Sequence, residues 1–120
     1  MLSVVLPLIM PEQGRGAMDM VNVFARFGIK PDCMENFLKI MLAYVPKVRS
    51  EEGCIRYEPC FDVADGADAE KNGHFVTISE TWESDEHLKT HLASDGMNSF
   101  REAVAPLCGE STIIVLRPII

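Results

Sequence analysis

Apolar residues along this chain change in a fixed order between the strand period of two and the helix period of about 3.6. The strand-like stretches are residues 19–29, 54–63, 74–82 and 111–117, and the helical stretches are residues 31–50 and 84–105. The resulting order of strand, helix, strand, strand, helix, strand is the split βαβ motif. The sequence therefore predicts an α+β, ferredoxin-like domain with an antiparallel four-stranded sheet.

Local signals set the ends of the two helical stretches. Pro31 suits a helix start, and Gly53 should stop the chain from continuing as a helix. Pro46 falls late in the first stretch and is expected to kink or shorten its last turns. Ser84 is a good N-cap, and Asp95-Gly96 is expected to divide the second stretch into two helices.

Strand faces follow from the period of two. In the first strand, Phe24 is expected on one face of the sheet. The opposite face is expected to carry Val21, Val23, Ala25 and Phe27. Pro59 cannot donate a ladder hydrogen bond, so the second strand is expected at an edge or with a bulge. Residues 64–73 read as a polar connection without an apolar anchor.

The chain has 120 residues, which is the size of one domain. We expect residues 19–120 to form that domain and residues 1–18 to be an appendage outside it. The appendage is either an arm that packs on a partner chain or a disordered segment. Its apolar part is interrupted by Pro7 and is too short to span a membrane.

Charge and cysteine usage narrow the possible partners and compartment. The formal net charge of −7 argues against nucleic acid and against an anionic membrane surface, both of which need clustered Lys and Arg. Four scattered cysteines without a C-x-x-C pair are typical of reduced thiols. We therefore expect a cytoplasmic protein that binds neither nucleic acid nor membranes.

Several cofactor and catalytic motifs are missing from the sequence. No G-x-G-x-x-G follows a strand, there is no phosphate-binding loop motif, and no G-x-S-x-G is present. Any reaction would then depend on side chains, on a metal, or on the electrons of the substrate itself.

Two histidines, His87 and His91, are four residues apart on the second helical stretch. This spacing can place two imidazoles on one metal ion, but Leu88 stands where the zincin motif has Glu, and no third ligand is evident. We expect no metal site. His91 lies at the margin of the apolar stripe, where an imidazole could serve as a general base or acid.

Three further residues combine polar atoms with apolar surroundings. Glu80 and Trp82 share a face of the third strand with Val76 and Ile78, so Glu80 is either paired or has a raised pKa. Trp82 and Tyr57 could be core residues or hydrogen-bond donors to a ligand. Taken together, these residues outline an apolar pocket with few polar groups, which is the usual form of a small-molecule site.

Three blocks, in this order and spacing, resemble the antibiotic biosynthesis monooxygenase family, and its quinol monooxygenases in particular. The blocks are Glu52-Gly53-Cys54-x-x-Tyr57, Glu80-x-Trp82-Glu83-Ser84 and His91-Leu92-x-Ser94. The resemblance covers about residues 20–118. It implies a dimeric α/β barrel, formed when the sheets of two copies meet, and oxygen chemistry without flavin, haem or metal.

The resemblance also implies roles for individual residues. His91 would transfer the proton, Trp82 and Tyr57 would line the ring or hydrogen-bond to it, and Glu80 would orient a partner. Phe24 and Met97 are the expected apolar walls of the substrate pocket. Many relatives have a second histidine where this chain reads Asp95-Gly96-Met97.

The haem-degrading branch of the superfamily uses a helix tryptophan and a ligating histidine, where this chain has His91 and Arg101. We therefore do not expect haem breakdown. The resemblance implies a cofactor-independent, homodimeric monooxygenase that oxidises a quinol or polycyclic phenol with O₂. One alternative is an isomerase of a small hydroxyketone signal, which would use His91 without consuming O₂. Another is a non-catalytic dimeric module that binds a small aromatic.

Overall fold

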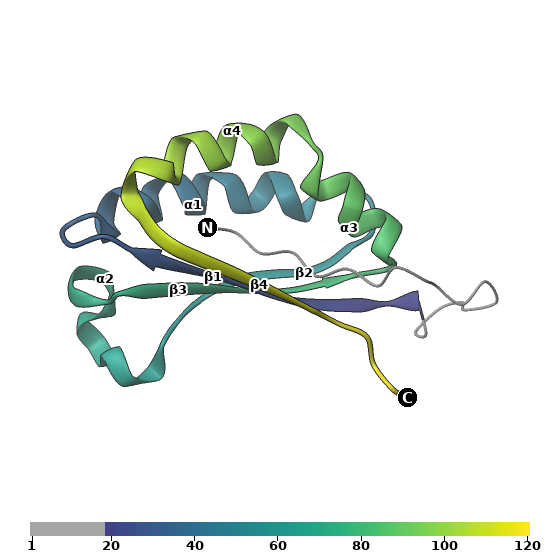
Figure 1. Cartoon of the computed structure of the whole chain (residues 1–120), viewed down its shortest axis with the longest axis horizontal. Helices are drawn as coiled ribbons and strands as arrows, with labels where there is room; N and C mark the ends of the chain where they lie inside the picture. Colours follow the sequence, from purple (N-terminus) through teal and green to yellow (C-terminus); the bar gives the residue numbers. More distant parts are fainter. Residues whose placement is uncertain (1–18) are drawn as a thin grey trace.

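The computed structural model describes residues 19–120, in which one face of a four-stranded sheet is covered by helices (Figure 1). The strands are β1 (Val21–Ile29), β2 (Cys54–Phe61), β3 (Phe75–Trp82) and β4 (Cys108–Leu116). The main helices are α1 (Met34–Arg49), α3 (Asp85–Leu92) and α4 (Asp95–Val104), and the short ones are η2 (Val63–Asp68), α2 (Ala69–Asn72) and η3 (Ala105–Leu107). The expected appendage, residues 1–18, lies outside the described residues.

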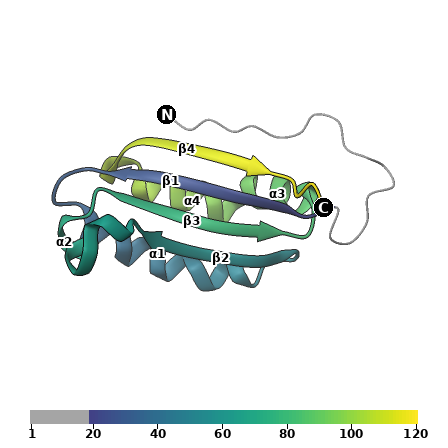
Figure 2. The same cartoon turned by 90° about the horizontal axis from the view of Figure 1, so that it is seen from below.

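The sheet has the order β2-β3-β1-β4, and every neighbouring pair is antiparallel (Figure 2). This arrangement confirms the predicted ferredoxin-like α+β fold. Within this single chain the sheet is open, with β2 and β4 at its edges. Pro59 lies in an edge strand, as its missing N–H requires, and a register shift lies between Cys54 and Arg56 of the same strand.

The core lies between the sheet and the three main helices. Alternate residues of β1 and β3 face the helices, including Val23 and Ile78, which are both completely buried. Helix α1 contributes Phe37, Met41 and Val48 at helical spacing. The residues between them on the strands point to the other face of the sheet, where no main helix covers them (Figure 1).

Two helix starts differ from expectation. Helix α1 begins at Met34, three residues after Pro31, and it ends at Arg49, close to the predicted residue 50, with Pro46 inside it. Helix α4 begins at Asp95, so Asp95 and Gly96 form its first turn and do not break it. Ser94 caps this helix by accepting a hydrogen bond from the backbone N–H of Met97 (3.1 Å).

The connection between β2 and β3 also differs from expectation. It folds into η2 and α2, and Ala69 is 3% exposed. The segment thus has an apolar anchor, which the sequence analysis missed because three alanines scattered among polar residues do not mark which of them is buried. Strand β4 begins at Cys108, three residues before the predicted 111, since the chain enters the sheet directly from η3.

Gly53 fixes the turn between α1 and β2. Its backbone has φ +83°, and a Cβ atom there would collide with the ring of His87. The close approach brings the start of β2 against α3, and this positions the loop residue Glu51 beside that helix. Within residues 19–120, none of the helices combines the length and apolar character needed to cross a bilayer.

Candidate functional site

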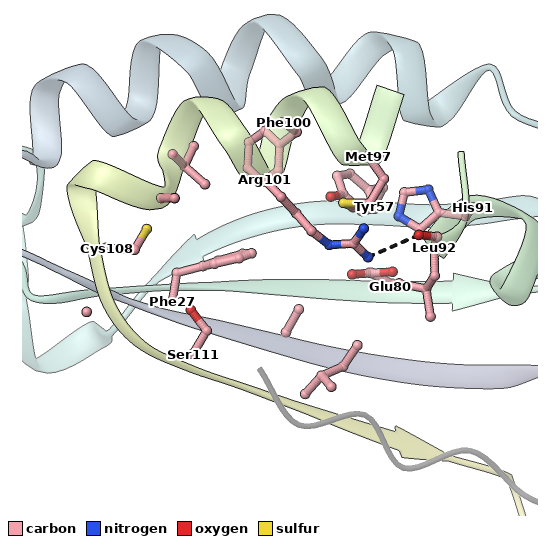
Figure 3. A pocket seen from close by; sticks show the side chains of 15 residues that line it. Phe27, Tyr57, Glu80, His91, Leu92, Met97, Phe100, Arg101, Cys108 and Ser111 are labelled. Atoms are coloured by element: carbon pink, nitrogen blue, oxygen red, sulfur yellow. Dashed lines mark hydrogen bonds between the residues drawn. The ribbon is translucent and has the colours of Figure 1, made fainter. Parts of the chain in front are cut away.

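A cavity of about 240 Å³ lies between the helix-facing side of the sheet and helices α3 and α4 (Figure 3). Most of its wall is apolar and includes Phe27, Phe100 and Ile113. Four titratable side chains with nitrogen or oxygen atoms project into the space: Tyr57, Glu80, His91 and Arg101. An apolar cavity with a few convergent polar groups matches the pocket that the sequence predicts.

The imidazole of His91, on α3, is the group in this cavity that is best placed to take up a proton. The side chain is 1% exposed, and its Nδ1 lies 2.9 Å from Oε1 of Glu51. Its Nε2 is buried and has no hydrogen-bond partner among residues 19–120, and Figure 3 shows the ring turned toward the cavity. Burial lowers the pKa of His91, although the hydrogen bond that the ring donates to Glu51 opposes this shift, so the ring is neutral at pH 7.

Glu80 of β3 faces the same cavity and is 4% exposed. Burial raises the pKa of its carboxyl to about 7, while the hydrogen bond from Trp82 opposes the shift. Near neutral pH this group can therefore either donate or accept a proton. The sequence left two possibilities for Glu80, a paired carboxyl or a raised pKa. Both apply: the carboxyl accepts a hydrogen bond from Trp82, and burial raises its pKa.

Trp82 lies behind the cavity wall and holds its neighbours in place. The indole is completely buried, and its Nε1–H donates to Oε1 of Glu80 (2.9 Å). The indole also stacks on the ring of His91, with centroids 4.7 Å apart and an interplanar angle of 29°. Trp82 is thus a positioning residue for both titratable groups.

Tyr57 of β2 lies opposite Glu80 in the sheet register and is 2% exposed. Its ring meets that of His91 edge-on at 5.8 Å. Burial raises the pKa of the phenol well above its usual 10, and the negative charge of Glu80 adds to the shift. The hydroxyl therefore keeps its hydrogen at neutral pH and can donate it to a ligand oxygen.

The two residues expected as apolar walls have different outcomes. Met97 of α4 lines the cavity. Phe24 does not: its side chain is 43% exposed and lies on the face of the sheet away from the helices. A strand places neighbours on opposite faces, and Ala25 and Phe27 are the β1 residues that line the cavity. The strand alternation already separated Phe24 from this set, so the sequence contained the signal.

Sequence reasoning missed two charged residues at the site. Glu51, in the loop after α1, holds His91 by a hydrogen bond. It directly precedes Glu52, the first residue of a block that was singled out in the sequence, but Glu51 itself was assigned no role. Arg101 of α4 lines the cavity and donates to the carbonyl oxygen of Leu92 (3.1 Å) (Figure 3). Its spacing of four from Met97 on one helix face was the available signal.

His87 does not share a site with His91. Its Nδ1 lies 2.8 Å from Oγ of Ser84, the residue that caps α3, whereas Nδ1 of His91 is engaged by Glu51. In the part of the chain that the structure describes, no three His, Cys, Asp or Glu side chains come together as a metal site would require. Cys54 and Cys60 are free thiols.

Known proteins with this fold are numerous. Among solved structures, a conserved protein from Methanosarcina mazei Go1 is 22% identical, with a TM-score of 0.74 over 84% of this chain and 94% of its own. A protein from Mycobacterium tuberculosis is 26% identical, with a TM-score of 0.71 over 84% of this chain and 96% of its own. A candidate antibiotic biosynthesis monooxygenase from Caulobacter crescentus CB15 is 22% identical, with a TM-score of 0.74 over 88% and 94%.

No curated protein matches this chain. The family model described as antibiotic biosynthesis monooxygenase matches residues 20–103, which include all three sequence blocks. Because this match covers well over half of the 120 residues, the chain belongs to the antibiotic biosynthesis monooxygenase family.

Proposed function

We propose that this protein is a monooxygenase that oxidises a small quinol or a similar phenol with O₂, with His91 as the general base. The observation that carries the proposal is Nε2 of His91, which is buried at an apolar cavity and has no hydrogen-bond partner in the described part of the chain. A neutral imidazole with a free nitrogen can remove the proton of a phenolic hydroxyl. The family to which the chain belongs makes oxygen chemistry the natural use of that base.

The reaction is balanced by one quinol and one O₂, which give one hydroxyquinone and one water. His91 removes a hydroxyl proton, and the electron-rich quinolate passes an electron to O₂. The two radicals then join at a ring carbon to form a peroxide. Return of the proton to the outer peroxide oxygen gives a hydroperoxide. The O–O bond then breaks as the same ring carbon loses its hydrogen, so that one oxygen atom stays on the ring and the other leaves as water with these two hydrogens. The quinol supplies all four electrons.

The remaining polar groups have complementary roles in this proposal. The Tyr57 hydroxyl donates a hydrogen bond to the substrate oxygen, and the positive charge of Arg101 stabilises the quinolate. Glu80, whose pKa is about 7, can supply a proton to the departing oxygen. Trp82 keeps Glu80 and His91 in position, and Met97 forms part of the apolar wall that excludes water.

The cavity size bears on the substrate. Its volume of about 240 Å³ lies below the roughly 300–1,000 Å³ of pockets for drug-sized ligands. This favours a substrate of one or two rings over a larger polycyclic phenol. The sequence lacks a nucleotide or flavin fingerprint, and we propose that the protein uses no cofactor, the electrons coming from the quinol itself.

We also propose that the protein is a cytoplasmic homodimer. We call the sheet face opposite the main helices the bare face. It exposes large apolar side chains from β1 and β4, including Phe24, Ile114 (53% exposed) and Leu116. An apolar sheet face of this kind is the feature that a second copy would cover. The two sheets would then face each other, as in the dimeric barrel that the family resemblance implies.

One alternative function is supported by the same cavity. His91 as a neutral base and Glu80 as an acid could move a proton between two carbons of a small hydroxyketone, which is the chemistry of an isomerase. A plain binding module would need neither group. Oxygen consumption separates the monooxygenase from both alternatives.

The test is an oxygen-electrode assay with reduced menadione on the whole protein after treatment with a chelator, corrected for spontaneous oxidation. We expect protein-dependent oxygen uptake that survives chelation. The variant His91→Gln removes the base while keeping a polar side chain, and we expect its turnover to fall by roughly 10²–10⁴-fold, as for loss of a general base.

The matched control is His74→Gln, the same substitution at an exposed histidine just before β3. This control should keep turnover within about twofold of the wild type, since surface substitutions away from the site are usually mild. Absence of uptake by the wild-type protein, or full turnover in His91→Gln, would rule out the proposed function.

A further inference from the structure

Glu51 and His91 form part of the wall between two hollows of the molecule. His91 lines the inner cavity, whereas Glu51 lines a second hollow of about 460 Å³ on the outer surface. That outer hollow is bordered by charged residues at the solvent, among them Lys47, Glu52 and Glu86. The hydrogen bond of 2.9 Å between Nδ1 of His91 and Oε1 of Glu51 crosses the wall.

Exposure differs sharply between the two partners. The side chain of Glu51 is 28% exposed, whereas that of His91 is 1% exposed. A proton on Nδ1 is therefore one hydrogen bond from a group that water can reach. The substrate side of the ring has no such contact, because Nε2 is buried without a partner among the described residues.

The chemistry of the pair fixes the tautomer of the ring. A carboxylate accepts hydrogen bonds and cannot donate them, so Nδ1 of His91 carries the hydrogen. The lone pair of the neutral ring is then on Nε2, which faces the cavity (Figure 3). The ring is thus a base toward the substrate and a donor toward the outer hollow.

We propose that Glu51 is the outer half of a proton relay that carries the substrate proton through His91 to the solvent at the outer hollow. This inference rests on the proposed function. When Nε2 takes the proton, Nδ1 passes its own proton to Glu51, so the ring stays neutral and Glu51 becomes the carboxylic acid. Water in the outer hollow can then exchange this proton without entering the substrate cavity.

The relay solves a problem that the proposed reaction poses. The quinolate must be electron-rich when it meets O₂, and a proton held beside it on a positively charged ring would counteract this. The relay removes the proton to the far side of the wall. When the peroxide breaks, the same path runs backward: Glu51 returns a proton to Nδ1, and Nε2–H delivers one to the departing oxygen.

The other charged or titratable groups around His91 do not offer this route. They are Glu80 on β3, Tyr57 on β2 and Arg101 on α4, and all three line the inner cavity. Arg101 lowers the pKa of His91 whereas Glu51 raises it. Among these neighbours, only Glu51 lines the outer hollow as well as binding the ring.

The test uses Glu51→Gln in the full-length protein. The amide oxygen of Gln can still accept the hydrogen bond from Nδ1, so the ring keeps its place, but the amide cannot accept a proton. We expect kcat to fall tenfold or more with KM within about twofold, because the lost step does not affect substrate binding. We also expect a larger solvent deuterium isotope effect on kcat.

The matched control is Glu52→Gln, which removes the same charge from the exposed neighbour in the same loop and the same hollow. It should leave kcat and the isotope effect unchanged. Glu51→Asp keeps a carboxylate at shorter reach and should recover part of the lost kcat, while circular dichroism verifies the fold of each variant. A Glu51→Gln protein with wild-type kcat and isotope effect would overturn the relay.

A second readout does not depend on turnover. Nitrogen NMR of labelled His91 should show the Nδ1–H tautomer in the wild type, and a lower pKa of the ring in Glu51→Gln but not in Glu52→Gln. If menadiol is not oxidised at all, the proposed function fails while this measurement still decides the coupling of the pair. An Nε2–H tautomer in the wild type, or an unchanged pKa in Glu51→Gln, would refute the relay by itself.

Discussion

The two faces of the sheet are built by the same strands but have opposite surroundings. On the covered face, Ile78 is completely buried and the polar groups Glu80 and His91 are nearly so. On the bare face, Phe24 and Ile114 are 43% and 53% exposed although both are large and apolar. Apolar character alone therefore does not decide burial in this molecule; helix cover does.

This contrast separates two requirements of the proposed function. The covered face holds titratable groups away from water, which shifts their pKa values and prepares them for proton transfer. The bare face instead offers an apolar surface for a second copy. Variants on each face should thus change different properties.

The largest expected effect comes from shortening the same side chain on either face. Ile78→Ala removes buried atoms from the core of a strand and should lower the free energy of unfolding by about 2–5 kcal/mol. Ile114→Ala should cost less than about 1 kcal/mol in the monomer, since half of the side chain already meets water. Urea unfolding at low protein concentration measures both, and equal costs would contradict the difference between the faces.

The next effect concerns the buried carboxyl of the covered face. The pKa of Glu80 is raised from 4.5 to about 7 in the folded protein, so the folded state binds more protons than the unfolded state in this range. The stability that this group contributes is therefore fully present below pH 4.5 and is lost as pH rises through 7. At about 1.4 kcal/mol for each pKa unit, the loss is on the order of 3 kcal/mol.

Glu80→Gln cannot ionise and can still accept the hydrogen bond from Trp82. The variant should accordingly lose less stability than the wild type between pH 4 and pH 9, as followed by urea unfolding at a series of pH values. Glu83→Gln, an exposed carboxyl beside the same strand, is the control and should follow the wild-type curve. Parallel curves for Glu80→Gln and the wild type would argue against a raised pKa at Glu80.

The smallest effect on the fold, but a direct one on assembly, is expected from a charge on the bare face. Ile114→Glu should weaken the proposed dimer tenfold or more, which is about 1.4 kcal/mol or more, because a buried unpaired carboxylate would have to lose its water. Sedimentation equilibrium measures the change, and circular dichroism should show an intact fold. The control is Val63→Glu in η2, where the side chain is 96% exposed.

If the wild-type protein is monomeric at high concentration, no second copy covers the bare face and the proposed dimer is wrong. The difference between the faces would then be one of helix cover alone. A dimer that tolerates Ile114→Glu as well as Val63→Glu would instead place the contact on another surface.

Part of this site could be read from the sequence because it depends on local order. The period of two placed Glu80 and Trp82 on the buried face of their strand, and the helical period placed His91 near the apolar stripe of α3. Ser84 was recognised as a cap because its side chain acts on the next turn of the chain. Such signals need only neighbouring residues.

What the sequence could not provide were contacts between distant segments. Glu51 and His91 are 40 residues apart and meet because the turn at Gly53 places the loop after α1 against α3. Phe24 is a different case, because the alternation along β1 already separated it in the sequence from Ala25 and Phe27, which line the cavity. Arg101 was overlooked because a charged residue on a helix is usually solvated.

By itself, then, the sequence determined the order of elements, the faces of each strand and helix, and the family. Those properties follow from periodicity and from short motifs, which are local. Only the tertiary structure decided that His91 faces a cavity, that Glu51 holds its other side, and that, within residues 19–120, Nε2 has no partner and helices cover one sheet face alone. The protonation of a buried group depends on everything packed around it, and that packing exists only once the chain has folded.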